Sequence, residues 1–313
     1  MAWHDTLCAI FGYQPEYRVA EENGEIVGVL PLFLVHNFVT GKVLISTPFA
    51  VYGGILASDD AAHDALCEHM KALARREYVE HAELRNSFDH QVSGFDGIDR
   101  YVTFTRDVQP ATQDELLASL PQKTRNVVRK ALKQGYTTRK AANLDAFYGL
   151  LLETYRRHGT PVFPKHFFTT IAEKFGDEVD VREVLLDGKV VAASLNFIYQ
   201  RQMHTYYAAS SRECWKLNCN DFMYFDHISW AGQNGIDVFD FGRSKVGSGP
   251  YEFKKHWGAT PRPLPYEVML VKRREMPNFT QTNPKFDMAV RLWQRMPLVL
   301  TRLVGPRLVA LFP

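Results

Sequence analysis

The segment DGKVVAASLNF, at Asp187–Phe197, decides the fold, because the chain holds a similar segment, NGEIVGVLPLF, at Asn23–Phe33. Each segment opens with a turn dipeptide, Asp-Gly or Asn-Gly, that separates two apolar runs and is the strongest short signal for a β-hairpin. Both apolar runs then end at a phenylalanine. The sequence therefore predicts the same hairpin twice, far apart in one chain.

A second pair of segments repeats in the same order. His69–Arg85 and His227–Arg243 each show the end of a helix, a short link and a strand that ends at arginine. Tyr52 and Tyr207 are each expected to close the strand before that helix. An ordered repeat of hairpin, strand, helix and strand indicates a duplicated domain. We therefore expect two similar α/β domains and a helical tail, at 1–100, 101–275 and 276–313.

The second copy carries the fuller set of elements. Strands are expected at 101–108, 179–186, 189–199, 203–209, 236–241 and 264–272, and helices at 113–134, 144–158, 164–175 and 221–234. Strand, helices, antiparallel strands, helix and strand is the order of the GNAT acyltransferase fold, which predicts mixed, mostly antiparallel sheets flanked by helices. The first copy has a short stretch before its hairpin, so we expect it to lack an opening strand and helix at its N-terminus.

Composition narrows the class of protein. The chain has 313 residues, of which 46% are hydrophobic, so it can build ordinary globular cores. A formal net charge of +2 is too small to indicate a polyanion partner by itself. The cysteines have neither disulfide-framework nor zinc-ligand spacing, and with no signal peptide they indicate reduced thiols in the cytoplasm. They are Cys8, Cys67, Cys214 and Cys219.

The end of the chain, Met296–Pro313, is apolar with interspersed arginines, among them Arg302 and Arg307. Such a segment can lie on a membrane surface, which here would be the inner membrane. Docking of the tail on its own protein is the interpretation that we favour.

A glycine-rich basic segment, FDFGRSKVGSGPYEFKKHWGA, occupies Phe239–Ala259 in the second copy. Arg243 and Lys245 can contact phosphate or carboxylate groups, and Lys254 follows an aromatic residue, Phe253. Such a lysine can stabilise an oxyanion or a donor phosphate during acyl transfer. The alternative is a strand followed by a solvated loop.

The segment PQKTRNVVRKALKQGY, at 121–136, predicts a helix with one basic stripe. Arg125, Arg129 and Lys133 are spaced four residues apart and therefore lie on one face. The stripe can bind a diphosphate or an RNA backbone, and the alternative is a solvated helix face.

The segment MHTYYAASSRECWKLNCNDFMY, at 203–224, joins a strand to a helix. Tyr206 and Tyr207 end the strand, and Asn220 and Asp221 begin the helix as caps. Alternatively the latter two face a substrate, and Asp221 accepts a proton from an attacking amine. The connection AASSREC, at 208–214, lacks the glycines of the pyrophosphate loop that binds coenzyme A, so acetyl-CoA is not the expected donor.

On these motifs the chain resembles the FemAB family of tandem-GNAT acyltransferases, and most of all its members associated with exosortase/PEP-CTERM systems. The matching motifs are Gly28–Leu32, Thr47–Phe49, Tyr52–Gly54, Arg125–Ala131, Asn220–Phe222, Phe241–Lys245, Phe253–Lys254, Trp257–Gly258, Asn283–Lys285 and Met296–Leu298. In this family, Fem peptidyltransferases move an amino acid from aminoacyl-tRNA to an amine of a peptidoglycan precursor. The resemblance implies that Lys254 acts at the reacting acyl ester.

We therefore expect an N-acyl or aminoacyl transferase of peptidoglycan-like or exopolysaccharide precursors in the cell envelope. The expected donor is aminoacyl-tRNA or another anionic acyl carrier, without metal or bound cofactor. The alternatives are a non-catalytic RNA- or membrane-surface-binding protein and a structural partner of the export machinery. The candidate catalytic residues are Lys254 and Asp221, and the candidate substrate-binding residues are Arg243, Lys245, Phe253, Tyr206, Tyr207, Asn220, Arg125, Arg129 and Tyr52.

Overall fold

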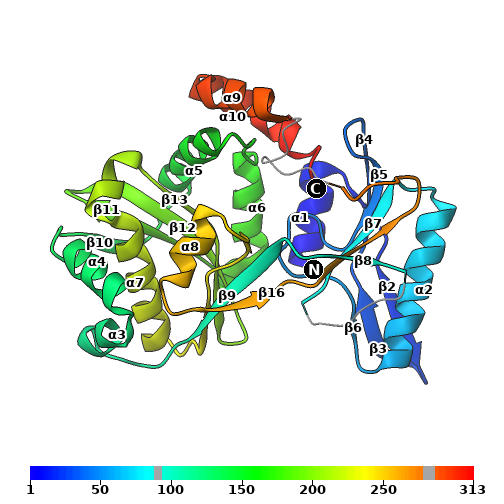
Figure 1. The fold of residues 1–313 in the computed structure, drawn as a ribbon, viewed down its shortest axis with the longest axis horizontal. Helices are drawn as coiled ribbons and strands as arrows, with labels where there is room; N and C mark the ends of the chain where they lie inside the picture. Colours follow the sequence, from blue (N-terminus) through cyan, green and yellow to red (C-terminus); the bar gives the residue numbers. More distant parts are fainter. Residues whose placement is uncertain (88–93, 278–285) are drawn as a thin grey trace. The chain divides into compact units, whose positions relative to one another are not determined.

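The computed structural model describes residues 1–87, 94–277 and 286–313 (Figure 1). The predicted tail motif Asn283–Lys285 lies outside the described residues. The chain divides into two compact units, each assembled from separate stretches of sequence. Unit 1 comprises Met1–Tyr101, Pro263–Lys285 and Arg307–Pro313, and unit 2 comprises Val102–Arg262 and Phe286–Pro306.

Both repeated hairpins form as the sequence predicts. In unit 1 the hairpin joins β2 (Arg18–Glu22) to β3 (Glu25–Leu30), and in unit 2 it joins β11 (Val179–Leu186) to β12 (Lys189–Tyr199). Both turn residues are left-handed in each case, with φ of 52° and 86° at Asn23-Gly24 and 50° and 77° at Asp187-Gly188. Asn, Asp and Gly tolerate this conformation, which matches the twist of paired strands.

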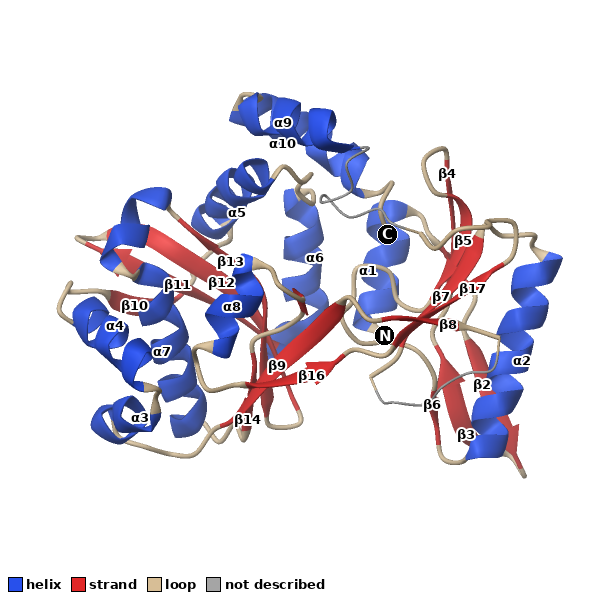
Figure 2. Ribbon diagram, in the orientation of Figure 1, coloured by secondary structure: helices blue, strands red, loops and turns tan. Residues whose placement is uncertain are grey.

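Unit 2 is a mixed sheet covered by helices on both faces (Figure 2). Its strand order is β10-β11-β12-β13-β14-β9-β15. Apart from the hairpin strands, its elements are β9 (Tyr101–Asp107), α3 (Gln113–Ser119), α4 (Gln122–Leu132), β10 (Thr137–Lys140), α5 (Asp145–His158), α6 (Lys165–Phe175), β13 (Gln202–Ser210), α7 (Cys219–Gln233), β14 (Val238–Asp240), β15 (Ser244–Lys245), α8 (Gly249–Lys255), β16 (Thr260–Pro263), α9 (Asp287–Arg295) and α10 (Leu298–Val309). Pro121 divides the single helix expected at 113–134 into α3 and α4.

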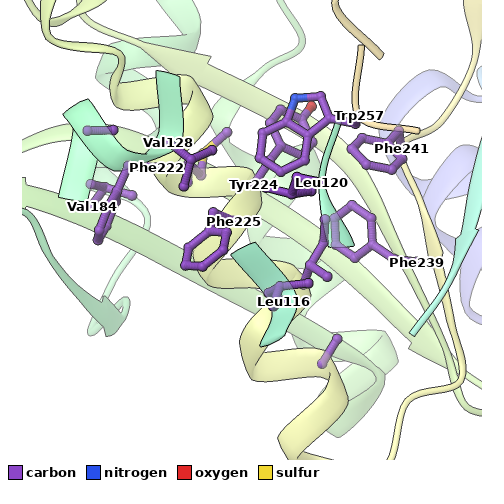
Figure 3. Packing of buried hydrophobic residues seen from close by; sticks show 14 of the residues in the cluster. Leu116, Leu120, Val128, Val184, Phe222, Tyr224, Phe225, Phe239, Phe241 and Trp257 are labelled. Carbon is purple, nitrogen blue, oxygen red and sulfur yellow. The ribbon is translucent and has the colours of Figure 1, made fainter. Parts of the chain in front are cut away.

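The core of unit 2 joins one face of the sheet to α4, α7 and α8. Figure 3 shows aromatic side chains of α7 beside those of the strand that follows it. Tyr224 packs against Phe241, Phe253 and Trp257, with ring centroids 5.3, 5.4 and 6.1 Å away. Trp257 is 1% exposed. The segment that the sequence analysis marked as basic and glycine-rich is therefore anchored by its aromatic residues.

Unit 1 repeats the strand pattern. In each unit an antiparallel pair, β4 with β5 or β12 with β13, is followed by a helix and a strand parallel to the second of the pair. Apart from its hairpin strands, the elements of unit 1 are α1 (Ala2–Phe11), β1 (Gln14–Pro15), β4 (Phe33–Asn37), β5 (Gly41–Ile45), β6 (Leu56–Ala57), α2 (Asp60–Arg76), β7 (His81–Arg85), β8 (Asp96–Ile98) and β17 (Tyr266–Leu270). This confirms the predicted tandem α/β fold.

Two strands join sheets in a way that the sequence did not indicate. Strand β9 forms as expected as the first strand of the second copy in the sequence. In the sheet it lies inside and pairs with β14, and the polar strand β10 lies at the edge. Strand β17 was expected to close the second copy, but it pairs with β7 and β8 of unit 1. Alternation of apolar residues predicts a strand, whereas the backbone hydrogen bonds that select its partner carry no side-chain signature.

Three smaller predictions also need correction. Tyr207 does not close its strand, since β13 continues to Ser210. Helix α1 precedes the first hairpin, where none was expected, because this short helix lacks a side-chain cap that would mark it. Tyr52 does not close a strand, since β5 ends at Ile45 and Pro48, which has no N–H, follows. The chain re-joins the sheet at Gly53, whose N–H donates to the carbonyl of Arg85 at 2.8 Å.

Candidate active site

The candidate site lies where two parallel strands of unit 2 part. Pairing of β13 with β14 covers Gln202–His204 and Val238–Asp240 and then stops, while β13 continues to Ser210. Just beyond that point the register of β13 against β12 shifts, so that Tyr206 has no directly opposed residue. A bulge of this kind redirects side chains and backbone groups at a strand edge. Beyond His204, therefore, β13 has no pairing with β14 on that side.

Lys254 lies on α8 and points its ammonium group at the turn after β14. Ser248 caps this helix by accepting a hydrogen bond from the N–H of Tyr251. Lys254 is 7% exposed, and its Nζ donates to the carbonyl oxygens of Gly242 at 2.7 Å and Arg243 at 3.1 Å. Burial lowers the pKa of Lys254 to about 8, against the opposing effect of the Asp240 carboxylate. An ammonium has three N–H donors, so these two carbonyls leave one for a ligand.

Asp240 fixes the turn that holds Lys254. Its side chain is fully buried, and Oδ1 accepts hydrogen bonds from the Thr103 hydroxyl at 2.8 Å and the Gly242 N–H at 2.7 Å. Oδ2 accepts from Gln202 Nε2 at 3.3 Å. The carboxylate is therefore the buried counter-charge of Lys254. Asp240 was not among the predicted site residues, because one aspartate in an apolar run gives no distinctive signal.

Gly242, in the turn that follows Asp240, has a conformation and surroundings that exclude a side chain. Its φ is +76°, a left-handed value. A Cβ added there would lie 2.9 Å from Nε2 of His204 and 3.3 Å from the carbonyl oxygen of Thr205. The close approach brings the Gly242 carbonyl within reach of Lys254.

Aromatic residues of β13 lie beside the same turn. The ring of Tyr207 packs against Phe163 and Phe168, with centroids 5.8 and 5.1 Å away, and against Tyr206 at 5.0 Å. Burial raises the pKa of Tyr207 well above its usual value, and the positive charge of Arg243 partly opposes this. Burial also raises the pKa of Tyr155 of α5, and the positive charge of Arg243 partly opposes this. Tyr155 was not among the predicted site residues. Lys254, Arg243, Tyr206 and Tyr207 are therefore brought together.

The other candidate residues have structural contacts, lie on other elements or belong to unit 1. Arg125 donates from Nη2 to the carbonyls of Ala118 and Leu120 at the end of α3, and Arg129 is exposed on α4. Lys245 lies in β15, and the ring of Phe253 contacts the core rather than standing free. Tyr52 belongs to unit 1.

Asn220 and Asp221 do not cap α7, contrary to one of the two predictions for them. The helix begins at Cys219, and its N-cap residue is Asn218, with φ of 58° and no side-chain hydrogen bond. Asn220 and Asp221 therefore lie within the first turn, and both are half-buried. Burial raises the pKa of Asp221 to about 6, against a hydrogen bond from its own backbone N–H.

At the corresponding position of unit 1, the arginine at the end of the strand is bound by backbone groups of the same unit. Arg85, which corresponds to Arg243, is buried, and its Nη1 donates to the carbonyls of Thr47 and Ala50 at 3.3 and 3.4 Å. A parallel bridge between Gly53 and Asn86 continues the strand contact beyond that arginine. The arginine of unit 1 that corresponds to Arg243 is therefore held by backbone carbonyls of its own unit.

The described residues include no group of three or more His, Cys, Asp or Glu side chains that could hold a metal ion. Within the same residues, no helix is long and apolar enough to cross a membrane. All four cysteines are free thiols.

Comparison with known proteins defines the class. Residues 119–255 match the acetyltransferase (GNAT) domain, so the chain carries a GNAT acyltransferase domain, and this domain contains Lys254 and Asp221. No curated protein sequence is detectably similar to the chain.

Three solved structures have the same tandem fold. FemX is 16% identical, with a TM-score of 0.68 over 93% of each chain. The C-terminal domain of a putative lysylphosphatidylglycerol synthetase from Agrobacterium fabrum is 12% identical, with a TM-score of 0.55 over 94% of this chain and 90% of that one. A tandem GNAT protein from the clavulanic acid pathway is 12% identical, with a TM-score of 0.55 over 88% and 89%. At these identities the likeness concerns the fold.

Proposed function

We propose that this protein transfers an acyl or aminoacyl group from an anionic carrier to an amine of a cell-envelope or exopolysaccharide precursor. The observation that carries the proposal is the buried ammonium of Lys254 at the parting strands, with two N–H donors bound to backbone carbonyls and one available. A fixed cation in a buried position can stabilise negative charge that develops on the donor carbonyl oxygen.

The proposed reaction uses three side chains of the protein, Lys254, Asp221 and Arg243. The acceptor amine attacks the acyl carbon, and Lys254 donates a hydrogen bond to the oxyanion that forms. Asp221 accepts the proton that the amine releases. The bond from the acyl carbon to the carrier atom, which is oxygen in an aminoacyl-tRNA and sulfur in an acyl-carrier protein, then breaks, and that atom takes up the proton from Asp221. Arg243, which is exposed beside Lys254, binds the anionic part of the carrier. Holding both reactants in one site supplies much of the rate.

The connection that follows β13 supports a donor other than acetyl-CoA. Residues Arg212–Leu217 form a 3-10 helix, not a glycine-rich loop. Its backbone N–H groups are used internally, for example from Cys214 to Ser211 and from Asn218 to Trp215. The name of lysylphosphatidylglycerol synthetase, a protein with a similar fold, includes a lysyl group, which supports an aminoacyl donor.

The test is mass spectrometry of products from purified protein that is offered an amine acceptor with one donor at a time. The donors are acyl-CoA, acyl-carrier protein and aminoacyl-tRNA, and the acceptors are peptidoglycan-precursor peptides and amino sugars. We expect a new amide from acyl-carrier protein or aminoacyl-tRNA. Product from acyl-CoA alone would contradict the proposed donor class, and no product with any donor would contradict the proposed reaction.

The raised pKa of Asp221 predicts the acidic limb of the pH profile. A general base must be deprotonated, so kcat/KM should rise with pH and level off above about 6. Asp221→Asn should lower kcat roughly 100-fold or more, and its profile should lack this limb. Asp226→Asn, on the same helix, is the control. If Asp221→Asn keeps both the rate and the limb, another group takes the proton.

A further inference from the structure

Helices α9 and α10 carry exposed apolar side chains that the transfer chemistry does not use. We call this the tail face, and its apolar members range from 40 to 84% exposed: Met288, Leu292, Val299, Leu300, Leu303 and Val304. All six lie in the part of unit 2 at Phe286–Pro306. Isolated apolar side chains on a surface need no explanation, but a group on consecutive helices marks an interaction site.

The same helices are fixed to unit 2 by their other sides. Trp293 is 6% exposed, and Val290 lies so close to Gly159 that a Cβ there would be 2.4 Å from Cγ1 of Val290. Arg156 Nη1 donates to the carbonyl oxygen of Met296 at 3.2 Å. Gly305 is buried, and a Cβ on it would be 3.2 Å from backbone atoms of Val162. The tail face therefore cannot turn inward without breaking these contacts.

The charges on α9 and α10 are mostly of one sign, and the exception is the exposed Asp287 at the start of α9. From Met288 to Pro306 the charged residues are Arg291, Arg295 and Arg302, with no Asp or Glu between them. All three are exposed. Apolar side chains interspersed with arginine are the composition of helices that lie in the interface of an anionic bilayer. A second copy fits less well, because a two-fold contact would bring like charges together.

We propose that the tail face docks this protein on an anionic phospholipid bilayer. The apolar side chains enter the boundary between headgroups and acyl chains, and the arginines bind lipid phosphates. This surface is separate from the site of transfer, so the two proposals can fail independently. It also resolves the alternatives for the tail, because one side docks on the protein and the other remains available to lipid.

The test is co-sedimentation of the full chain with phosphatidylcholine vesicles that contain or lack phosphatidylglycerol. We expect binding to the anionic vesicles that weakens as salt is added. Leu292→Glu with Leu303→Glu, and separately Arg295→Gln with Arg302→Gln, should each reduce partitioning roughly tenfold or more. Phe38→Glu is the control, because Phe38 is an exposed apolar residue of unit 1 at 88%.

Three results would overturn the proposal. The first is equal binding to both kinds of vesicle or to neither. The second is a reduction by Phe38→Glu as large as that of the tail variants. The third is a concentration-dependent dimer, measured by light scattering, that the tail variants dissociate, since the tail face would then bind a second copy. Unchanged thermal unfolding of the variants would show that the losses do not come from misfolding.

Discussion

Replacement of Lys254 by methionine should lower kcat by roughly 100- to 1000-fold, the effect of removing one donor to a developing oxyanion. Methionine keeps the apolar stem and removes the ammonium, so the buried space remains filled. The two carbonyls that lose their donor cost stability, and the removal of a buried charge offsets part of that cost. The measurement is single-turnover transfer with the donor identified by mass spectrometry.

The pH profile separates a catalytic role of Lys254 from a structural one. Because its pKa is lowered to about 8, the wild-type rate should fall as pH rises above 8 and the ammonium loses its proton. Lys254→Met should lack this alkaline limb. Lys255→Met, at the exposed neighbouring position of α8, should behave as wild type. A Lys254→Met protein with wild-type turnover, or with the alkaline limb intact, would rule out the assigned role.

The local part of the fold could be predicted from sequence because its signals are local. Asn23-Gly24 and Asp187-Gly188 specify hairpin turns through the backbone conformations that these residues tolerate. Strand β10 was missed because its residues, TTRK, are polar and mostly exposed, which leaves no alternation to detect. Strand β17 was recognised as a strand and given the wrong sheet. Its place depends on long-range contacts such as the hydrogen bond from Asn86 Nδ2 to Glu267 Oε2 at 2.8 Å.

The candidate site could be predicted in its charged residues and not in its supports. Lys254 and Arg243 lie in one basic segment, so their nearness follows from the sequence. Asp240 lies in the same segment, but its hydrogen bonds with Thr103 and Gln202 depend on the sheet, and Tyr155 comes from α5. Arg125 shows the opposite case, because a basic stripe predicts ligand binding, whereas its guanidinium binds carbonyls at the end of a helix. The spacing of charged residues predicts which of them share a helix face, but it does not predict which groups that face contacts.

Replacement of Gly242 by alanine should destabilise unit 2 more than any other glycine-to-alanine change in the basic segment. The left-handed backbone costs an L-residue about 1 to 2 kcal/mol, and forcing a methyl group into a packed site costs about 1 to 3 kcal/mol more. The new Cβ would press on a backbone carbonyl and on a buried ring, neither of which can move freely. Urea unfolding followed by tryptophan fluorescence measures this, because unit 2 contains Trp215, Trp230, Trp257 and Trp293.

Gly247 provides the matched control for this change. Its φ is +74°, nearly that of Gly242, and no atom lies within 4 Å of the position of an added Cβ. Gly247→Ala should therefore cost about 1 to 2 kcal/mol, from backbone strain alone. The difference between the two variants isolates the close approach at Gly242, which holds the carbonyl that binds Lys254. If the turn at Gly242 is tight, Gly242→Ala should lose transfer activity and Gly247→Ala should keep it. Equal destabilisation of the two variants, with transfer activity kept in both, would show that the approach at Gly242 is not tight.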